Sequence, residues 1–389
     1  MFSVGGDAVS AADPFSRRQQ QLGGRRRRSR LRGDVSRVVR RAVRSTKSQG
    51  ICFDSSERLL RQRVPEELSS GTGALLRPYR PVRGLELFFI DMKAEEHILS
   101  FLWYVANKSS MRECALLFNM ADSAVLAVIY RVLDFLCSIA PDIICFAADK
   151  GALANDFKKR AGFPNVIGCI DGTYIPTRCP NNKTESTYIN RHDQVSITMQ
   201  GICDAKGRFQ DVFTGPPSKV HDARLLRLSV VQQDLPAICA VNKYHLLGDA
   251  AYPIREHLLT PFKNYGTMTK AKVEYNQRHA STRVVTENTF GMLKQRFRQL
   301  RYVEFPTVDK ITRLIIGCCV LHNICMDAGD MSVEDILTDE ERTERREDIA
   351  LHARKSRAEL EAVRQPQTAH DNVLRQLGEA KKNTIAQLF

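Results

Sequence analysis

The sequence predicts an α/β protein in which helices flank a mixed β-sheet, preceded by a helical segment and a basic arm. Three observations support this. Residues 85–146 show a helical spacing of apolar side chains, β-forming segments begin at Asn165, and strands and helices then alternate to about residue 326. Such an order is typical of a sheet covered by helices. With 389 residues, the chain has room for two or three units of ordinary size.

The first 50 residues are the most basic part of the chain. They hold thirteen Lys and Arg against three Asp, and the whole chain has a formal net charge of +14. Residues 51–326 carry +8, and residues 327–389 carry −4. Because residues 1–80 have only scattered apolar side chains, we expect a disordered basic arm there. Its arginines are typical both of a nuclear-import or nucleic-acid-binding segment and of a plain solvated tail. We expect a nuclear location, with a cytoplasmic pool as the alternative.

Composition argues against secreted and membrane classes. The eleven Cys include no pair with zinc-site spacing, and several lie in apolar runs, which is typical of a reducing compartment. No uninterrupted apolar run approaches the ~20 residues that a membrane-spanning helix needs. We therefore expect no association with a membrane.

Residues 85–150 are predicted to form a helical, helix-turn-helix-like domain. Apolar side chains of Glu95–Asn107 recur at the helical period, and a Ser-x-x-Glu capping box at Ser110 begins a second helix. After a short turn, Ala124–Ile139 has a continuous apolar face, which predicts a third helix. The turn has helix-turn-helix dimensions, but Arg131 is the only basic residue of that third helix. The pattern is compatible with contact to DNA and with a structural bundle.

Residues 160–326 are predicted to form the α/β domain, and residues 327–389 a charged helical tail. A turn signal, Asp204-Ala205-Lys206-Gly207, predicts that the strands on either side of it form a hairpin. In chain order, the expected elements are strands at Val166–Ile175, Val195–Ile202 and Arg208–Thr214, a helix at His221–Gln233, a strand at Tyr244–Leu247, and helices at 281–300 and about 307–326.

Four carboxylates lie where predicted elements begin, end or meet. Asp171 interrupts an apolar strand, and Asp249 ends another. If these strands are parallel neighbours, the two carboxylates meet at one edge of the sheet, where α/β sheets place their sites. Asp222 begins the helix before the second strand, and Glu287 lies on a later helix. Because a buried carboxylate is costly unless it is paired or binds a cation, the set predicts a site for Mg²⁺ or Mn²⁺.

Basic residues accompany Glu287 on its helix. At about 100° per residue, Lys294 and Arg298 share an edge with Glu287, while Phe290 belongs to a separate apolar stripe. The two cations are candidates for holding phosphates; the alternative is a solvated basic face in which Glu287 is merely paired. Arg191, in the loop after the first strand, is a further candidate for contact with DNA, with a solvent-exposed loop as its alternative.

The polar pair His322-Asn323 lies within an otherwise apolar predicted helix. A buried pair that supports the fold is the favoured interpretation over a functional site.

Motifs around the four carboxylates occur in an order that resembles a known family. They are GCIDGT at 168–173, VHDAR at 220–224, LGDAAYP at 247–253 and VTENTFG at 285–291. Over residues 85–326 the chain resembles PIF/Harbinger transposases and the domesticated nucleases derived from them. The resemblance implies an RNase H-like fold and a divalent-metal phosphodiester site. It implies that Asp171, Asp249 and Glu287 are catalytic and ligate the metal, with Asp222 as a further ligand or support.

The resemblance implies a metal-dependent endonuclease, or a transposase-like phosphoryl transferase, that acts on DNA. The alternative is a non-catalytic DNA-binding or scaffold protein that retains an ancestral transposase fold. Members of the family work with a Myb/SANT-like partner protein, so the resemblance also implies a partner of this kind, bound through the charged C-terminal helix or the helical segment.

Overall fold

A computed structural model describes residues 94–241, 243–263, 266, 268–329 and 369–389. The expected basic arm at 1–80 and most of the charged tail lie outside these residues. The described α-helices are α3 (Ala94–Asn107), α4 (Met111–Leu117), α5 (Asp122–Ile143), α6 (Lys150–Ala161), α7 (Asp222–Leu228), α8 (Val231–Ile238), α9 (Lys270–Arg296), α10 (Val308–Asp327) and α12 (Ala369–Ala386), and short 3-10 helices lie at η2 (Glu185–Thr187) and η3 (Arg298–Arg301).

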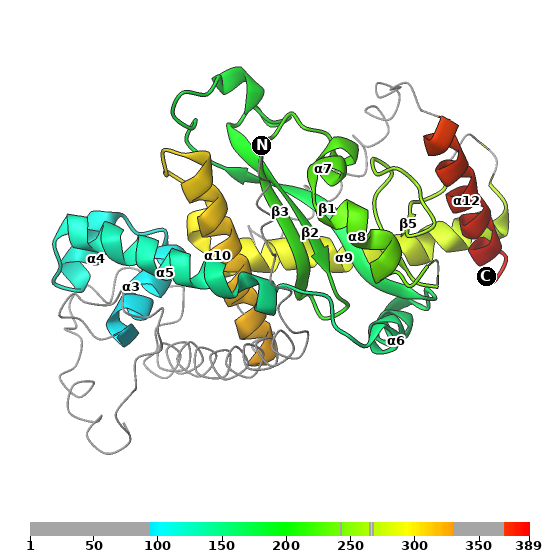
Figure 1. Ribbon diagram of the computed structural model, residues 1–389, viewed down its shortest axis with the longest axis horizontal. Coiled ribbons are helices and arrows are strands. Elements are labelled where there is room, and N and C mark those ends of the chain that lie inside the picture. Colours follow the sequence, from blue (N-terminus) through cyan, green and yellow to red (C-terminus); the bar gives the residue numbers. More distant parts are fainter. Residues whose placement is uncertain (1–93, 242, 264–265, 267, 330–368) are drawn as a thin grey trace, which may run out of the picture.

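A five-stranded mixed sheet in the order β3-β2-β1-β4-β5 forms the centre of the molecule (Figure 1). β1, β2 and β3 pair antiparallel, whereas β4 runs parallel to β1 and β5 parallel to β4. The strands that lead to Asp171 and Asp249 are therefore parallel neighbours, which is the condition under which the two carboxylates were expected to meet. The strands are β1 (Val166–Pro176), β2 (Ser196–Cys203), β3 (Phe209–Pro217), β4 (His245–Leu247) and β5 (Leu258–Leu259).

The predicted hairpin is formed by β2 and β3. Asp204 holds its turn, because Oδ1 accepts hydrogen bonds from the backbone N–H groups of Lys206 and Arg208, both at 2.9 Å. Gly207 adopts φ +82°, a left-handed conformation that glycine takes without steric cost. The local turn chemistry thus fixes how these two strands meet.

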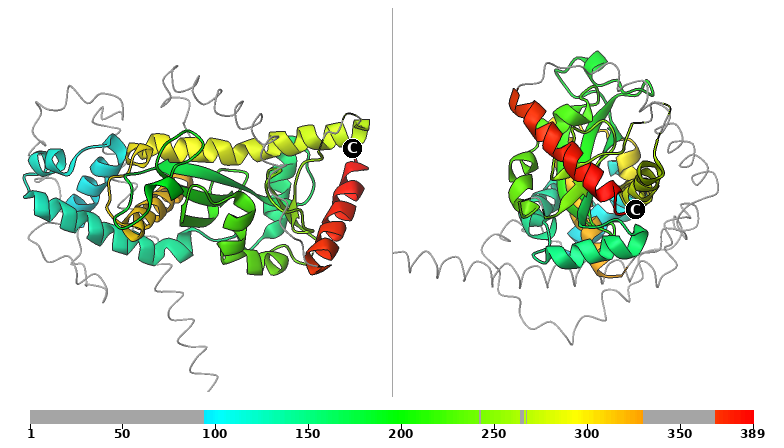
Figure 2. Two further views of the ribbon diagram at one scale, coloured as in Figure 1. Left: turned by 90° about the horizontal axis from the view of Figure 1, so that it is seen from above. Right: turned by 90° about the vertical axis from the view of Figure 1, so that its right-hand side faces the viewer.

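Helices cover both faces of the sheet. The long α9 runs along one face, and α7 and α8 lie on the other, which is seen most clearly from above, where α9 is yellow (Figure 2). The face toward α7 and α8 buries Ile170 and Leu246, while the face toward α9 buries Cys169 and Leu247. Residues that alternate along β1 therefore pack into different clusters, as the period of a strand requires.

Two predicted helices differ from the observed ones. The helix expected at His221–Gln233 is divided into α7 and α8, because the Ser229 hydroxyl donates to the Leu226 carbonyl at 2.8 Å and closes the first of them. The helix expected at 281–300 is α9, which begins at Lys270 and ends at Arg296. Its first turns carry mostly polar side chains, and this obscures the helical period.

Helix α6 and strand β5 were not predicted. The signals for α6 are present in the sequence: Asp149 Oδ1 accepts from the Ala152 N–H at 2.9 Å, and Gly162, with φ +71°, ends the helix. These are a side-chain N-cap and a left-handed C-terminal glycine. Strand β5 has only two residues, too few to show a period.

Helices α3, α4 and α5 form where the helical segment was expected. The capping box at Ser110 is confirmed, since its hydroxyl accepts from the Glu113 N–H at 3.2 Å and its own N–H donates to the Glu113 carboxylate at 2.8 Å. These helices share one hydrophobic cluster with α10 and with strand residues such as Ile197. A Cβ on Gly317 of α10 would lie only 2.9 Å from Leu133 of α5, so the two helices approach closely there.

Helix α5 is long and apolar enough, by length and composition alone, to cross a membrane. In the folded chain one apolar face of this helix, which includes Val128 and Leu136, is buried in the shared cluster. Its one basic residue, Arg131, has a buried Nη1 with no hydrogen-bond partner among the described residues. These observations favour the structural bundle over a helix that reads a DNA groove.

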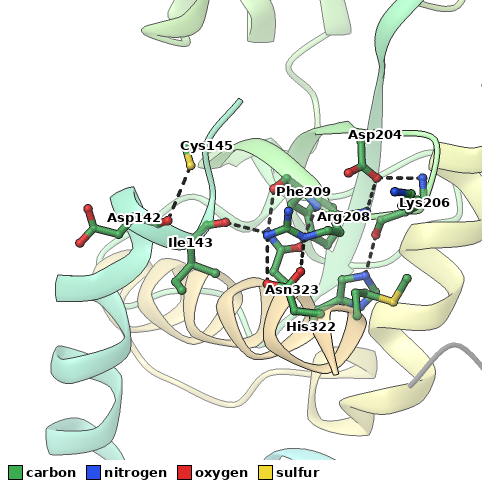
Figure 3. Close-up of polar contacts among 12 residues, drawn as sticks. Asp142, Ile143, Cys145, Asp204, Lys206, Arg208, Phe209, His322 and Asn323 are labelled. Carbon is green, nitrogen blue, oxygen red and sulfur yellow. Dashed lines mark hydrogen bonds and ion pairs between the residues drawn. The ribbon is translucent and has the colours of Figure 1, made fainter. Parts of the chain in front are cut away.

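His322 and Asn323 of α10 are buried, as expected for a polar pair that supports the fold (Figure 3). The Asn323 amide accepts from the Phe209 N–H at 2.8 Å and donates to the carbonyls of Phe209 at 2.8 Å and Ile143 at 3.1 Å. It therefore joins the start of β3 to the end of α5. His322 Nε2 lies 2.8 Å from the Gly207 carbonyl, which ties the hairpin turn to the same helix.

Replacing Asn323 by Ala should lower the free energy of unfolding by about 3 kcal/mol, because buried backbone groups that lose a partner cost about 1–3 kcal/mol each. Urea denaturation measures this. Asn107→Ala is the matched control, since that amide makes a single local bond to the Trp103 carbonyl at 3.2 Å. Equal losses in the two variants would contradict the role given to Asn323.

The C-terminal helix α12 packs across one end of the sheet beside α9 and β5 (Figure 1). Lys381 donates to the carbonyls of Glu256 at 2.7 Å and Tyr244 at 3.2 Å, and Arg255 pairs with Asp371 at 2.8 Å. The final described part of the charged tail is thus a component of the α/β core.

Candidate active site

Asp171 and its neighbours in β1 show which face of the sheet bears the site. The Cys169 thiol lies 3.7 Å from the carbonyl of Thr282, and the Asp171 carboxylate meets Arg283, both on α9. Alternate residues of β1 therefore face α9. Asp171 is one of few charged residues inside this sheet, with a side chain only 5% exposed. A carboxylate so deeply buried needs a cation beside it.

Asp249 follows β4, next to β1. Its Oδ1 accepts from the Ala251 N–H at 2.8 Å, in the turn that leaves the strand. Burial, followed by the negative charge of Asp171, raises the pKa of Asp249 to about 6. The two carboxylates therefore repel each other across the parallel pair of strands, as their predicted meeting implied.

Glu287 reaches the same place from α9, and Arg283 lies between it and the strand. The Arg283 guanidinium donates through Nη1 to Asp171 Oδ2 at 2.5 Å and through Nη2 to Glu287 Oε1 at 2.6 Å. Burial lowers the pKa of Arg283, but the charges of Asp171, Glu287 and Asp249 outweigh it and raise the pKa. The three predicted catalytic residues thus surround one guanidinium.

Asp222 approaches from the other face of the sheet. It is the first residue of α7, and its Oδ1 lies 2.7 Å from the point where a Cβ on Gly172 would stand. Because Gly172 follows Asp171 in β1, its outward direction is the α7 side. Only a glycine leaves room for the Asp222 carboxylate. Within the part of the chain that the structure describes, no group of three or more His, Cys, Asp or Glu side chains is arranged to hold a metal ion.

Two polar residues of the site were not predicted. The buried Tyr252 hydroxyl donates to Gln200 Oε1 at 3.5 Å. Burial, followed by the charges of Asp222, Asp171 and Asp249, raises the pKa of Tyr252, so it stays a neutral phenol. The signal for Tyr252 was its place in the motif around Asp249. No sequence signal marked Gln200, because its position opposite Gly172 follows only from the register in which β1 and β2 pair.

The predicted cations differ in their relation to the site. Lys294 donates to the Thr173 hydroxyl at 2.9 Å, and Thr173 lies two residues after Asp171 on the same side of β1. Arg298 lies in η3, beyond the end of α9, so the helical angle that grouped it with Glu287 does not apply. The Arg191 guanidinium lies over the Tyr174 ring, 5.6 Å from its centre. The structure therefore places Lys294 beside the carboxylates.

The side chains fit a divalent cation in their chemistry. Mg²⁺ and Mn²⁺ prefer oxygen ligands. Asp171 in β1 presents a buried carboxylate, and Asp249 after β4 and Glu287 on α9 present partly buried ones. Burial and the charge of Asp171 both raise the pKa of Asp249, and the nearby Arg283 guanidinium lowers it. The arrangement of these carboxylates does not fit a cation, because the Arg283 guanidinium occupies the position between Asp171 and Glu287.

The part of the chain that holds the four carboxylates is similar to known proteins. Residues 170–323 match the model of a family described as DDE superfamily endonuclease. The chain is 28% identical over 282 residues to "Putative nuclease HARBI1" of Homo sapiens, which covers 68% of this chain and 78% of that protein.

Two further relatives cover similar spans. The Bos taurus protein of the same name is 29% identical over 245 residues, 60% of this chain and 68% of its own length. "Protein ALP1-like" of Arabidopsis thaliana is 28% identical over 236 residues, 56% of this chain and 57% of its own. No solved structure matches. The expected resemblance is confirmed: residues 170–323 match a DDE superfamily endonuclease domain, and the chain is similar to proteins named "Putative nuclease HARBI1", which are of the Harbinger transposase-derived kind.

Proposed function

We propose that this chain is a divalent-metal-dependent endonuclease, or a transposase-like phosphoryl transferase, that acts on DNA phosphodiesters. The observation that carries the proposal is the meeting of Asp171 and Asp249 on parallel strands with Glu287 on the facing helix. Support for an RNase H-like fold comes from the strand order, with three antiparallel strands followed by two parallel ones. The family match and the names of the relatives agree with this chemistry.

Asp171, Asp249 and Glu287 would hold Mg²⁺ or Mn²⁺. When bound, the metal would supply activation of a water or a DNA 3′-hydroxyl and charge stabilisation at the leaving oxygen. Asp222 supports the strand from the opposite face, where its carboxylate abuts Gly172. Lys294 would bind a phosphate oxygen next to the carboxylates, and its bond to the Thr173 hydroxyl supports this role. Arg191 and Arg298 extend the proposed contact with the DNA backbone.

DNA as the substrate is supported by charge. Residues 51–326 carry a net charge of +8 in spite of the buried carboxylates. A positive body attracts the phosphate backbone and makes binding depend on salt. We further propose a nuclear location, supported by the arginine-rich first 50 residues, and a Myb/SANT-like partner protein, supported by the family.

Nicking of supercoiled plasmid by the full-length protein tests the proposal. Cleavage should require Mg²⁺ or Mn²⁺ and should stop on addition of EDTA. A non-catalytic scaffold would instead bind DNA with a steep salt dependence and leave the plasmid intact at every metal concentration.

Replacing Lys294 by Gln should weaken DNA binding about tenfold, equivalent to about 1.4 kcal/mol, because one phosphate contact loses its charge. Fluorescence anisotropy with a labelled duplex measures the affinity. Lys206→Gln is the matched control: this lysine pairs with Asp156 at 3.2 Å on the hairpin turn. A similar weakening in both variants would show a general charge effect rather than a role at the site.

A further inference from the structure

Arg283 makes the closest charged contacts in the proposed active site. A single guanidinium bridges β1 and α9, with Asp171 Oδ2 at 2.5 Å from Nη1 and Glu287 Oε1 at 2.6 Å from Nη2. The side chains of Arg283, Asp171 and Glu287 are 19%, 5% and 14% exposed, respectively. Water therefore screens this arrangement far less than it screens a surface ion pair.

The oxygens of Asp171 are both engaged. Oδ2 accepts from Arg283, and Oδ1 accepts from the Gly172 N–H at 2.9 Å. The Gly172 bond is held by the backbone of a central strand, whereas Arg283 is a long side chain with several rotatable bonds. A new ligand for the Asp171 carboxylate would thus displace the guanidinium more readily than the backbone donor.

A divalent cation and the Arg283 guanidinium compete for the same charge. Mg²⁺ lies about 2.0–2.1 Å from its oxygen ligands. A cation bound to Asp171 and Glu287 at such a distance would stand against the guanidinium that bridges them, and like charges repel strongly in a buried site. The two arrangements therefore exclude each other.

We propose that Arg283 is a positioning residue that acts as the counter-ion of the metal-free site and competes with the divalent cation for Asp171 and Glu287. It keeps two buried carboxylates from different elements together until a metal replaces it. This inference rests on the proposed function, which supplies the metal as ligand. It concerns Arg283, a residue that the motifs around the four carboxylates do not contain.

Mn²⁺ binding to full-length Arg283→Gln tests the inference, with isothermal titration calorimetry for affinity and thermal unfolding for stability. In EDTA, the variant should have a lower Tm than the unchanged protein, because the carboxylates lose their counter-ion. Its Mn²⁺ affinity should rise at least about tenfold, since no ion pair has to be broken, and Mn²⁺ should restore its Tm. Arg283→Lys keeps the positive charge but lacks the planar two-nitrogen fork that spans Asp171 and Glu287, so it should show an intermediate affinity.

Arg278→Gln is the matched control. Arg278 lies on the same helix and also pairs with a carboxylate four residues away, Glu274, at 2.7 Å. Its loss should leave the Mn²⁺ affinity unchanged. Mn²⁺ affinity equal or weaker in both Arg283 variants would overturn the inference, because Arg283 would then support the ligands instead of competing with the metal.

Failure of the Arg283 inference and failure of the proposed metal-dependent function give different results. If the unchanged protein binds Mn²⁺ and nicks plasmid while the Arg283 variants bind no tighter, only the inference fails. If neither the unchanged protein nor a folded variant binds Mn²⁺, the metal-dependent function fails together with it. Binding by the variant alone would support the competition, with Arg283 prevailing in the unchanged protein.

Discussion

Replacing Asp249 by Asn should reduce metal-dependent plasmid cleavage about a thousandfold or more, which corresponds to about 4 kcal/mol of transition-state stabilisation. The amide keeps the shape of the side chain and can still accept from the Ala251 N–H, so the turn after β4 should persist. The negative charge that a divalent cation needs is lost. Initial rates of nicking at saturating Mn²⁺ measure the effect.

Asp211→Asn is the matched control for this experiment. Asp211 lies on β3 of the same sheet, and burial likewise raises its pKa to about 6, but it is not among the groups that surround Arg283. Cleavage should be retained in that variant. Equal rates in the unchanged protein and Asp249→Asn, with both enzymes pure and folded, would remove the nuclease proposal and favour the scaffold alternative.

Acidification should destabilise the fold through its buried histidines, and His245 provides the sharpest case. It is fully buried, neither ring nitrogen has a hydrogen-bond partner among the described residues, and burial lowers its pKa well below the usual value. His279 and His322 are similar, with burial lowering the pKa of each to about 3. All three are neutral in the folded chain.

The direction in which stability changes with pH follows from protonation of the unfolded chain. A lowered pKa means that the unfolded chain binds protons first, so stability is full above about pH 6.5 and declines as the pH falls below it. At about 1.4 kcal/mol per pH unit, His245 should account for a loss of about 2 kcal/mol between pH 7 and pH 5. Other groups titrate in this range, so the comparison must be made between variants.

Urea denaturation at pH 7 and pH 5 of the unchanged protein and of His245→Leu isolates this contribution. The unchanged protein should lose about 2 kcal/mol more than the variant, because groups common to both cancel. His370→Leu, at an exposed position on α12, controls for the removal of a histidine as such. An identical pH dependence in the unchanged protein and His245→Leu would contradict the neutral buried state of His245.

The sequence was most informative where local chemistry decides structure. The capping box at Ser110 and the turn at Asp204 satisfy their hydrogen bonds within a few residues, so both could be predicted. The proximity of Asp171 and Asp249 could also be anticipated. Each carboxylate lies in or directly after an apolar segment predicted as a strand, and α/β sheets place their sites at the ends of neighbouring strands.

The contacts of Arg283 show which part of the site local sequence patterns could not predict. Its spacing of four residues from Glu287 indicates an ion pair, but its second contact, with Asp171, depends on how α9 lies across β1. The same holds for Asp222, whose approach to the opposite face of β1 follows from the position of α7. The grouping of Arg298 with Glu287 on one edge of a helix was wrong for a related reason: α9 ends at Arg296, and no cap signal marked that end.

The bonds of Asn323 to both Phe209 and Ile143 bear on which stretch of the chain can fold alone. The family match covers 170–323, yet the amide at its last position is satisfied partly by a carbonyl of α5, far upstream. A fragment cut to the match would lose α5, and with it the partner that covers α10 around Gly317. The smallest independent folding unit must therefore begin at or before α5, so a family boundary in sequence is not a boundary of cooperative unfolding.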